Sequence, residues 1–525
     1  MWWEKVVLRR RLKVVTGCSG TDSPVKALHS LVGPSNVDHI ASYESDPFAC
    51  DFIKAHFSPQ HMFTDVAALH DGSEKRCLDH PKPEGDDHDD HPDAGCATAS
   101  DDVDIFVAGF PCTPFSVYNI NQFMRSPMQK FGGKNAKPFF HISRYIDRAE
   151  PRCVVLENVE GTRKQFKSPH GAPVGKYKCP MDFILYGEKN SQKYGLKLKN
   201  KYRTHVLVAQ ADFFGLPHQR KRVYIVMLKK ELVSDEQWDV LIRKMLDIST
   251  VRRGNINEFL LSDDIVAKYV SLGWGGRERG PLRDENMETL QRVRTKQGFP
   301  DRYESGGQPF TKKLPREVCR TMGPRKCEVL DLVALFVRSR LGHLPYDLIG
   351  NLSQSVTRHA WYWNGSIETP TTTMELYHFG TKRFMVAAEL FQVMGWAEED
   401  LNLLNMDSGD WRMLVGNMMC VPAVGAVLCA VLSSVCLHSD SNLATPFFFF
   451  EYSQAHTLCV PDCHAHPPQA KACLSTDSLV NLLPPTTQAP CRHQRPVAAN
   501  ATAPPACSRH PPQLPSLPPA APKAW

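Results

Sequence analysis

Residues 101–116 read Asp-Asp-Val-Asp-Ile-Phe-Val-Ala-Gly-Phe-Pro-Cys-Thr-Pro-Phe-Ser, and the interpretation of the whole chain starts from them. Residues 103–108 form a short, mostly apolar run of the length of a buried parallel strand, and Gly109 permits a sharp turn after it. Cys112 therefore follows the carboxyl end of a strand, where open α/β sheets bind ligands. The two flanking prolines favour an extended, stiff loop. A thiol presented in this way suits a nucleophile, although a single cysteine is more often a small buried hydrophobe.

Two further apolar runs carry polar residues that strengthen the catalytic interpretation of Cys112. The run at 151–160 ends in Glu157 and Asn158, and a third run directly follows Arg220 and Arg222. A thiol, a carboxyl group and two guanidinium groups at the ends of three predicted strands form a combination that chance seldom provides.

The order of these motifs resembles the cytosine-C5 DNA methyltransferase family, which uses S-adenosylmethionine. The resemblance rests on Pro-Cys-x-Pro-Phe-Ser, Glu-Asn-Val and x-x-Arg-x-Arg, followed by Gly-Asn at 416–417, and it covers roughly residues 12–233 and 350–436. It implies an α/β fold: a Rossmann-like class I S-adenosylmethionine-dependent methyltransferase sheet with helices on both faces. A smaller variable recognition domain and a disordered C-terminal tail complete the expected architecture.

The first strand-to-helix turn is the candidate cofactor loop. It contains Gly17, Cys18, Ser19 and Gly20, between a β-rich start and a predicted helix at 25–31. Glycines let a ligand approach the backbone at the positive end of a helix. In the family this turn follows an acidic and an aromatic residue, and neither is present here.

Four other residues are expected to bind S-adenosylmethionine. Glu44 follows a predicted strand at 37–42, where a carboxylate accepts hydrogen bonds from ribose hydroxyls; the alternative is a helix-capping or solvated acid. The resemblance implies that Asp65 lies near the adenine amine. It also implies that Pro111 and Asn417 lie at the cofactor, and Asn417 additionally suits an N-cap for a helix at 423–436.

The catalytic residues implied by the resemblance are Cys112, Glu157, Arg220 and Arg222. The Cys112 thiolate adds to C6 of cytosine, with a pKa expected to be lowered by the arginines. Glu157, if protonated, donates to N3 and accepts from the exocyclic amine, whereas an isolated glutamate would simply pair with an arginine. Arg222 is expected to orient the flipped nucleotide and Arg220 to stabilise a loop or a phosphate. His218 replaces the glutamine usual in this motif.

The chain divides into four predicted regions. Residues 1–233 form the catalytic and cofactor-binding domain, with an acidic insertion at about 70–104. Residues 234–349 form the target-recognition domain, residues 350–436 return to the catalytic domain, and residues 437–525 form a Pro/Ala-rich disordered tail. The histidine and cysteine spacings match no familiar metal site, so no metal is assigned.

Three segments carry further expectations. Residues 117–137 contain paired glycines and suit a mobile lid over the substrate. The lysine-rich and glycine-rich stretch at 162–201 is expected to be a solvated loop, with phosphate contact as the alternative. Helices are predicted at 235–246 and 327–341.

Length and composition limit the possible locations and partners. The 525 residues carry a net charge of +6, which is compatible with a polyanion such as DNA. No apolar run approaches a membrane span, so no membrane partner is expected. Seventeen cysteines without a signal peptide favour a reducing compartment, and the proline-rich tail favours the nucleus. The oligomeric state is not indicated.

Three functions remain open at this stage. The first is a duplex DNA cytosine-C5 methyltransferase that flips its target base. The second is the tRNA-directed branch of the family, whose usual Cys-Phe-Thr tripeptide is absent from residues 234–349. The third is a non-catalytic chromatin-binding or nucleic-acid-binding module that retains the fold but has lost the cofactor.

Overall fold

The computed structural model describes residues 10–69, 77–78, 102–112, 115, 137–165, 177–189, 191–247, 252–271, 284–299, 309–314, 316–358, 360–402 and 408–435. Most of the acidic insertion at 70–104, all but the last residue of the expected lid at 117–137, and the tail at 437–525 lie outside these ranges.

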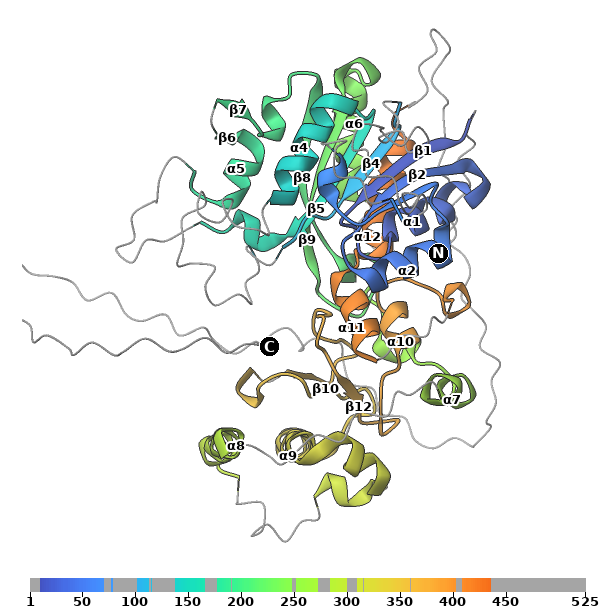
Figure 1. The fold of residues 1–525 in the computed structure, drawn as a ribbon. Helices are drawn as coiled ribbons and strands as arrows, with labels where there is room; N and C mark the ends of the chain where they lie inside the picture. The colour runs from blue at the N-terminus through green and yellow to red at the C-terminus, as the bar shows by residue number, and fades with distance from the viewer. Residues whose placement is uncertain are drawn as a thin grey trace, which may run out of the picture. The chain divides into compact units, whose positions relative to one another are not determined.

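A seven-stranded sheet with the order β3-β2-β1-β4-β5-β9-β8 organises the larger core (Figure 1). Strand β9 is antiparallel to both of its neighbours, and the remaining pairs of this sheet are parallel. The strand order reverses between β1 and β4, and the carboxyl ends of strands at such a point are where open α/β sheets bind ligands. The strands are β1 (Leu12–Gly17), β2 (Val37–Tyr43), β3 (His61–Phe63), β4 (Ile105–Ala108), β5 (Cys153–Val159), β8 (Tyr202–Gln210) and β9 (Lys221–Lys229).

Both faces of this sheet are covered by helices (Figure 1). Alternate strand residues point to opposite faces: Val14 and Val107 are buried in one cluster, Val15 and Phe106 in another. The first cluster includes residues of α1 (Ser23–Val32), α2 (Pro47–Phe57), α6 (Asp235–Asp247), α10 (Ala387–Gln392), α11 (Ser408–Asn417) and α12 (Val421–Leu432); the second includes residues of α4 (Lys137–Ala149) and α5 (Pro180–Tyr186). The predicted α/β class with helices on both faces is confirmed.

Helix α12 is apolar around its whole circumference because it packs in the core, in contact with α1 and α6. The stretch Gly409–Leu432, which includes α12, is long and apolar enough to span a membrane by length and composition, with a mean hydropathy of 2.0. In this fold 83% of that apolar window is buried. The expectation that no apolar run reaches this length is wrong, and burial against the sheet explains its composition.

A third cluster of buried residues includes Leu330, Val333 and Tyr377. It joins two helices to a four-stranded sheet with the order β11-β10-β12-β13. These elements are α8 (Asp284–Lys296), α9 (Arg316–Leu341), β10 (Ile349–Asn351), β11 (Trp361–Tyr362), β12 (Leu376–His378) and β13 (Arg383–Phe384), with α7 (Asp263–Ser271) preceding them. Helix α9 is broken at Gly323, where φ is 72°. The boundary at 234 stays a prediction. Leu241 of α6, which follows that position, packs in the first cluster with the large sheet.

The described part of the lysine-rich stretch at 162–201 is folded. Helix α5 is followed by the hairpin β6 (Glu188–Lys189) and β7 (Gln192–Lys193), and the side chains of Phe183 and Leu196 are fully buried. The Ser143 hydroxyl of α4 donates a hydrogen bond to the Tyr194 carbonyl at 2.8 Å. The expectation of a solvated loop is wrong for this part, because its apolar residues complete the core beside α4.

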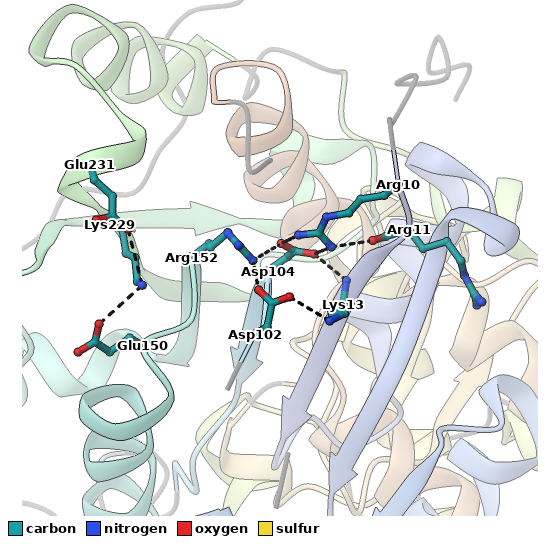
Figure 2. Close-up of polar contacts among 9 residues, drawn as sticks. All are labelled: Arg10, Arg11, Lys13, Asp102, Asp104, Glu150, Arg152, Lys229 and Glu231. Atoms are coloured by element: carbon teal, nitrogen blue, oxygen red, sulfur yellow. Dashed lines mark hydrogen bonds and ion pairs between the residues drawn. The ribbon is translucent and has the colours of Figure 1, made fainter. Parts of the chain in front are cut away.

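A charge cluster fixes the edge of the sheet at which β1, β4 and β5 begin (Figure 2). The buried Asp104 carboxylate accepts two hydrogen bonds from Arg10, at 2.7 and 2.9 Å, and one from the Lys13 backbone at 2.9 Å. Arg152 donates to it at 3.0 Å. A buried carboxylate needs such partners, so this edge is a structural one, opposite to the predicted catalytic edge.

Candidate active site

The loop that carries Cys112 is anchored by Asn158. The Asn158 amide, fully enclosed at the end of β5, donates a hydrogen bond to the Phe110 carbonyl at 2.9 Å. The Phe115 backbone donates to the Cys112 carbonyl at 2.8 Å, and the Phe115 ring is buried. Cys112 and its neighbour Pro111 remain half-buried. Sequence reasoning noted Asn158 beside the site but missed this anchoring role.

Glu157 and Arg222 form an ion pair on neighbouring strands. Antiparallel pairing sets Val159 opposite Arg222, which brings the Arg222 Nε to 2.8 Å from the Glu157 Oε1. Both side chains are 12% exposed, so they face a site that solvent still reaches. The pairing that sequence reasoning offered as the structural alternative for Glu157 is the arrangement observed.

Three segments converge on Gly109, directly after β4. A Cβ atom at this position would lie 2.8 Å from the Met419 Cε, 3.0 Å from the Cys18 carbonyl oxygen and 3.6 Å from the Glu157 Oε2. Glycine is therefore needed for this close approach. Glu157 therefore lies beside the candidate cofactor loop at 17–20. Met419 lies at the same point, although no sequence pattern led us to expect it there.

The electrostatics of Cys112 connect it to the same group of residues. Burial raises the pKa of the Cys112 thiol; the positive charge of Arg222 lowers it, Glu157 raises it and Arg220 lowers it. The net direction is upward. The expectation of a lowered pKa is wrong in this state, because burial outweighs the two arginines that act in the expected direction.

Arg220 is a buried clamp on the protein backbone. Its guanidinium group donates hydrogen bonds to the carbonyl oxygens of Pro370, Gly416 and Met418, at 3.0, 3.0 and 2.8 Å. Burial lowers its pKa to about 10, and the nearby Arg222 acts in the same direction. This geometry agrees with the loop-stabilising role expected for Arg220, because its guanidinium group holds the 416–418 turn. A catalytic role for Arg220 stays a prediction.

His218 is also enclosed in the protein. Its ring Nε2 lies 2.7 Å from the Val393 carbonyl oxygen, and burial lowers the pKa of the imidazole to about 3. A neutral ring therefore donates from Nε2 and ties the start of β9 to the end of α10. The replacement of glutamine at this position keeps a donor to the backbone.

The candidate cofactor loop follows β1, which ends at Gly17. Cys18 and Gly20 have positive φ values of 50° and 70°, and the Cys18 backbone donates to the Tyr43 carbonyl at 2.7 Å. The Ser19 hydroxyl donates to the Asp22 carboxylate. A Cβ atom at Gly20 would lie 3.1 Å from the Asn417 carbonyl oxygen, so the predicted residues Gly20 and Asn417 do meet.

Glu44 lies at the end of β2 and closes the loop from one side. One carboxylate oxygen accepts from the Gly20 backbone at 3.0 Å, and the other accepts from the backbones of Ser45 and Asp46 at 2.8 and 3.3 Å. Burial raises its pKa to about 7, against the opposing effect of these three donors. Glu44 thus lies beside the loop, whereas the N-cap of α2 is Asp46 and not Glu44. Its role in binding ribose stays a prediction.

Asp65 is exposed, and its carboxylate accepts from the Ala67 backbone at 2.8 Å. Burial raises the pKa of Cys18 well above its usual value, and the charges of Glu44 and then Asp65 raise it further. Both acids therefore act on the same loop. A nucleoside that carries a sulfonium cation fits this combination of acidic groups and closely approaching glycines, as S-adenosylmethionine would require.

Asn417 differs from the prediction in its local structure. It is the last residue of α11, whereas α12 begins at Val421 with Cys420 as its N-cap. The expected helix at 423–436 therefore starts earlier, and the capping role predicted for Asn417 is wrong. Pro422 is tolerated because the first turn of a helix needs no donor from its backbone.

The raised pKa of Glu44 predicts a pH-dependent effect of Glu44→Gln on stability. Between the unfolded pKa of 4.5 and the folded value of about 7, the folded state keeps a proton that the unfolded chain releases. Proton binding by Glu44 therefore stabilises the folded wild type below pH 4.5, and this stabilisation is lost as the pH rises from 4.5 through about 7. We expect the variant to gain about 2–3 kcal/mol relative to the wild type between pH 4.5 and 7.5. Urea titrations at several pH values measure this difference; a constant difference would contradict the assignment.

Residues 12–327, more than half of the chain, match the family described as C-5 cytosine-specific DNA methylase. A DNA (cytosine-5-)-methyltransferase DMT5 of Cryptococcus neoformans is 23% identical over 475 residues, which cover 83% of this chain and 18% of that protein. The type II methyltransferase M1.ScrFI of Lactococcus lactis is 26% identical over 240 residues, covering 42% of this chain and 54% of the relative. The chain thus spans about a fifth to a half of the length of these two relatives.

Among solved structures, the Dnmt2 methyltransferase of S. pombe is similar with 13% sequence identity and a TM-score of 0.38. The match covers 81% of this chain and 98% of that one. The extent of the family match decides the classification. The chain belongs to the C-5 cytosine-specific DNA methylase family, whose methyl donor is S-adenosylmethionine.

Proposed function

We propose that this chain transfers a methyl group to C5 of a flipped cytosine in duplex DNA, through a covalent bond between Cys112 and C6. The observation that carries the proposal is the meeting of three groups at one edge of the sheet. The Cys112 thiol interacts electrostatically with Glu157 and Arg222, and Glu157 lies beside the first loop through Gly109.

The first step assigned to the protein is addition of the Cys112 thiolate to C6. Ring carbon C5 then becomes electron-rich, which divides one difficult step into two easier ones. Arg222 and Arg220 both favour the thiolate, whereas burial opposes it. An incoming base that separates Glu157 from Arg222 would leave more of the Arg222 charge to the thiolate.

Glu157 and Arg222 are proposed to handle the cytosine ring. With a proton, the Glu157 carboxyl donates to N3 as negative charge develops there, and it accepts from the exocyclic amine. Arg222, released from its ion pair, orients the flipped nucleotide. The Gly17–Gly20 loop, Glu44, Asp65 and the 417 turn would hold S-adenosylmethionine. When bound, it would supply an electrophilic methyl group to C5 and leave as the neutral thioether. Loss of the C5 proton to water and elimination of the Cys112 sulfur then complete the reaction.

DNA as the substrate is supported by the family description and by the net charge of +6. The target base must leave the stack, because C5 and C6 are covered in a duplex. Residues 234–349 are proposed to carry target recognition. A nuclear location follows from a DNA substrate, and a fluorescent fusion of the full chain that stays outside the nucleus would contradict it.

The test is a covalent trap with 5-fluorocytosine, in which fluorine blocks the final elimination. Full-length protein with S-adenosylmethionine is mixed with duplex DNA or with tRNA that carries the analogue. We expect a denaturant-resistant adduct with DNA, and none for Cys112→Ala. An adduct with tRNA alone would assign the tRNA branch, and no adduct with either polymer would favour a non-catalytic module. If no adduct forms, titration calorimetry with S-adenosylmethionine tells whether the protein fails to bind the methyl donor or binds it without reacting.

A further inference from the structure

A pocket of about 820 Å³ lies between the end of α4 and the segment from β7 to the start of β8. Strands β5 and β8 both run opposite to β9, so their first residues share one edge of the sheet. The pocket contains Tyr202 at the start of β8 and Glu150 shortly before β5. It is therefore at the edge opposite to Cys112, separate from the candidate active site.

The charge of the pocket is mainly positive. Five basic side chains and two acidic ones line it: Arg144, Arg148, Lys193, Lys199 and Lys201, with Asp147 and Glu150. Lys199 pairs with Asp147 at 2.6 Å, and Lys201 pairs with Glu150. After these two pairs, three positive charges remain on the lining, which favours an anionic ligand.

Helix geometry directs two of these charges to the same side. Arg144 and Arg148 are four residues apart on α4, so they lie on one helix face. Arg144 is held in place by hydrogen bonds to the Gln192 side chain at 2.9 Å and to the Tyr194 hydroxyl at 3.0 Å. A guanidinium group fixed in this way presents its remaining donors without further ordering, as phosphate recognition by arginine requires.

The wall of the pocket that faces α4, which includes Tyr194 and Lys199, is also held in place. Tyr194 is buried, and its backbone carbonyl accepts from Ser143 of α4. The Lys199 side chain is only 4% exposed, and burial lowers the pKa of its ammonium group. Ammonium groups are seldom enclosed in this way, and its single described carboxylate partner, Asp147, is 54% exposed. An anion in the pocket would add a second partner for Lys199.

We propose that this pocket binds a phosphate-bearing small molecule of about nucleotide size. Its volume lies within the range of about 300–1,000 Å³ found for small-molecule sites. The combination of a fixed arginine, a buried lysine and further basic side chains that form no salt bridge among the described residues suits the recognition of phosphate oxygens. The site is independent of the methyl-transfer chemistry, because its residues lie at the other edge of the sheet.

The experiment is titration calorimetry of the full-length protein with inorganic pyrophosphate at about 0.15 M ionic strength, where distant charges are screened. Lys193→Gln removes a charge from the lining, and we expect pyrophosphate to bind about fivefold more weakly. Lys197→Gln is the matched control, because Lys197 lies on the same segment with its ammonium group 5.6 Å from the Tyr186 ring centre, outside the lining. It should change the affinity less than about twofold.

Three results would overturn the proposal. The first is the absence of binding heat in a protein that melts cooperatively. The second is an equal loss of affinity in Lys193→Gln and Lys197→Gln, which would indicate general attraction to a basic surface. The third is duplex DNA that displaces pyrophosphate and loses affinity in Lys193→Gln, which would assign a polymer to the pocket. Since pyrophosphate binding is measured without methyl transfer, failure here leaves the proposed function untouched.

Discussion

Cys112→Ala is expected to reduce methyl transfer to duplex DNA by at least about 10⁴-fold, because no other group can form the bond to C6. Cys112 is half-buried, and alanine removes only its sulfur atom. The variant should therefore melt at nearly the wild-type temperature. Tritium transfer from labelled S-adenosylmethionine measures the activity, and a thermal melt measures the fold.

A matched cysteine substitution separates chemistry from packing. Cys429 is a free, buried thiol on α12, and alanine suits the interior of that helix. Cys429→Ala should keep activity within a few-fold, although it loses some packing contacts. If Cys112→Ala retained more than a tenth of the wild-type activity, the covalent mechanism would be wrong.

Gly416→Ala is expected to destabilise the protein by about 2–3 kcal/mol and to impair methyl transfer. A Cβ atom at this position would lie 2.2 Å from the Thr372 backbone nitrogen and 2.6 Å from the Thr371 carbonyl carbon. Both obstacles are backbone atoms, so they cannot rotate away as a side chain would. The turn must move, and it carries the carbonyl that accepts from Arg220 and precedes the residue in contact with Gly20. Denaturant unfolding and S-adenosylmethionine titration measure the two consequences.

Gly425→Ala provides the control with the same chemical change. This glycine lies inside α12, and its added Cβ would meet the Ala27 Cβ at 3.4 Å, near ordinary contact. Helix propensity should then offset the crowding, with a change between about zero and 1 kcal/mol in either direction. If both variants lost the same free energy of unfolding, the close approach of the Thr372 backbone would not be the cause of the loss in Gly416→Ala.

The sequence by itself determined the class of fold and the order of the main elements. Strands at 103–108 and 37–42 and the helix at 235–246 correspond to β4, β2 and α6. These elements were predictable because runs of apolar residues, prolines and glycines act locally on the backbone. The motifs also named Cys112, Glu157 and Arg222. Cys112 and Glu157 lie at the carboxyl ends of the parallel strands β4 and β5. Arg222 joins them because the antiparallel strand β9 begins where β5 ends.

Tertiary structure alone decided how those residues act on one another. Arg220 binds a carbonyl 196 positions away, and Asn158 holds a loop 48 positions before it. The direction of the Cys112 pKa depends on burial against nearby charges, a balance that composition does not specify. Contacts between residues far apart in the sequence also fold the lysine-rich stretch and form the pocket beside α4. Long-range packing determines burial and contact partners, whereas the local pattern of residues determines only which elements form.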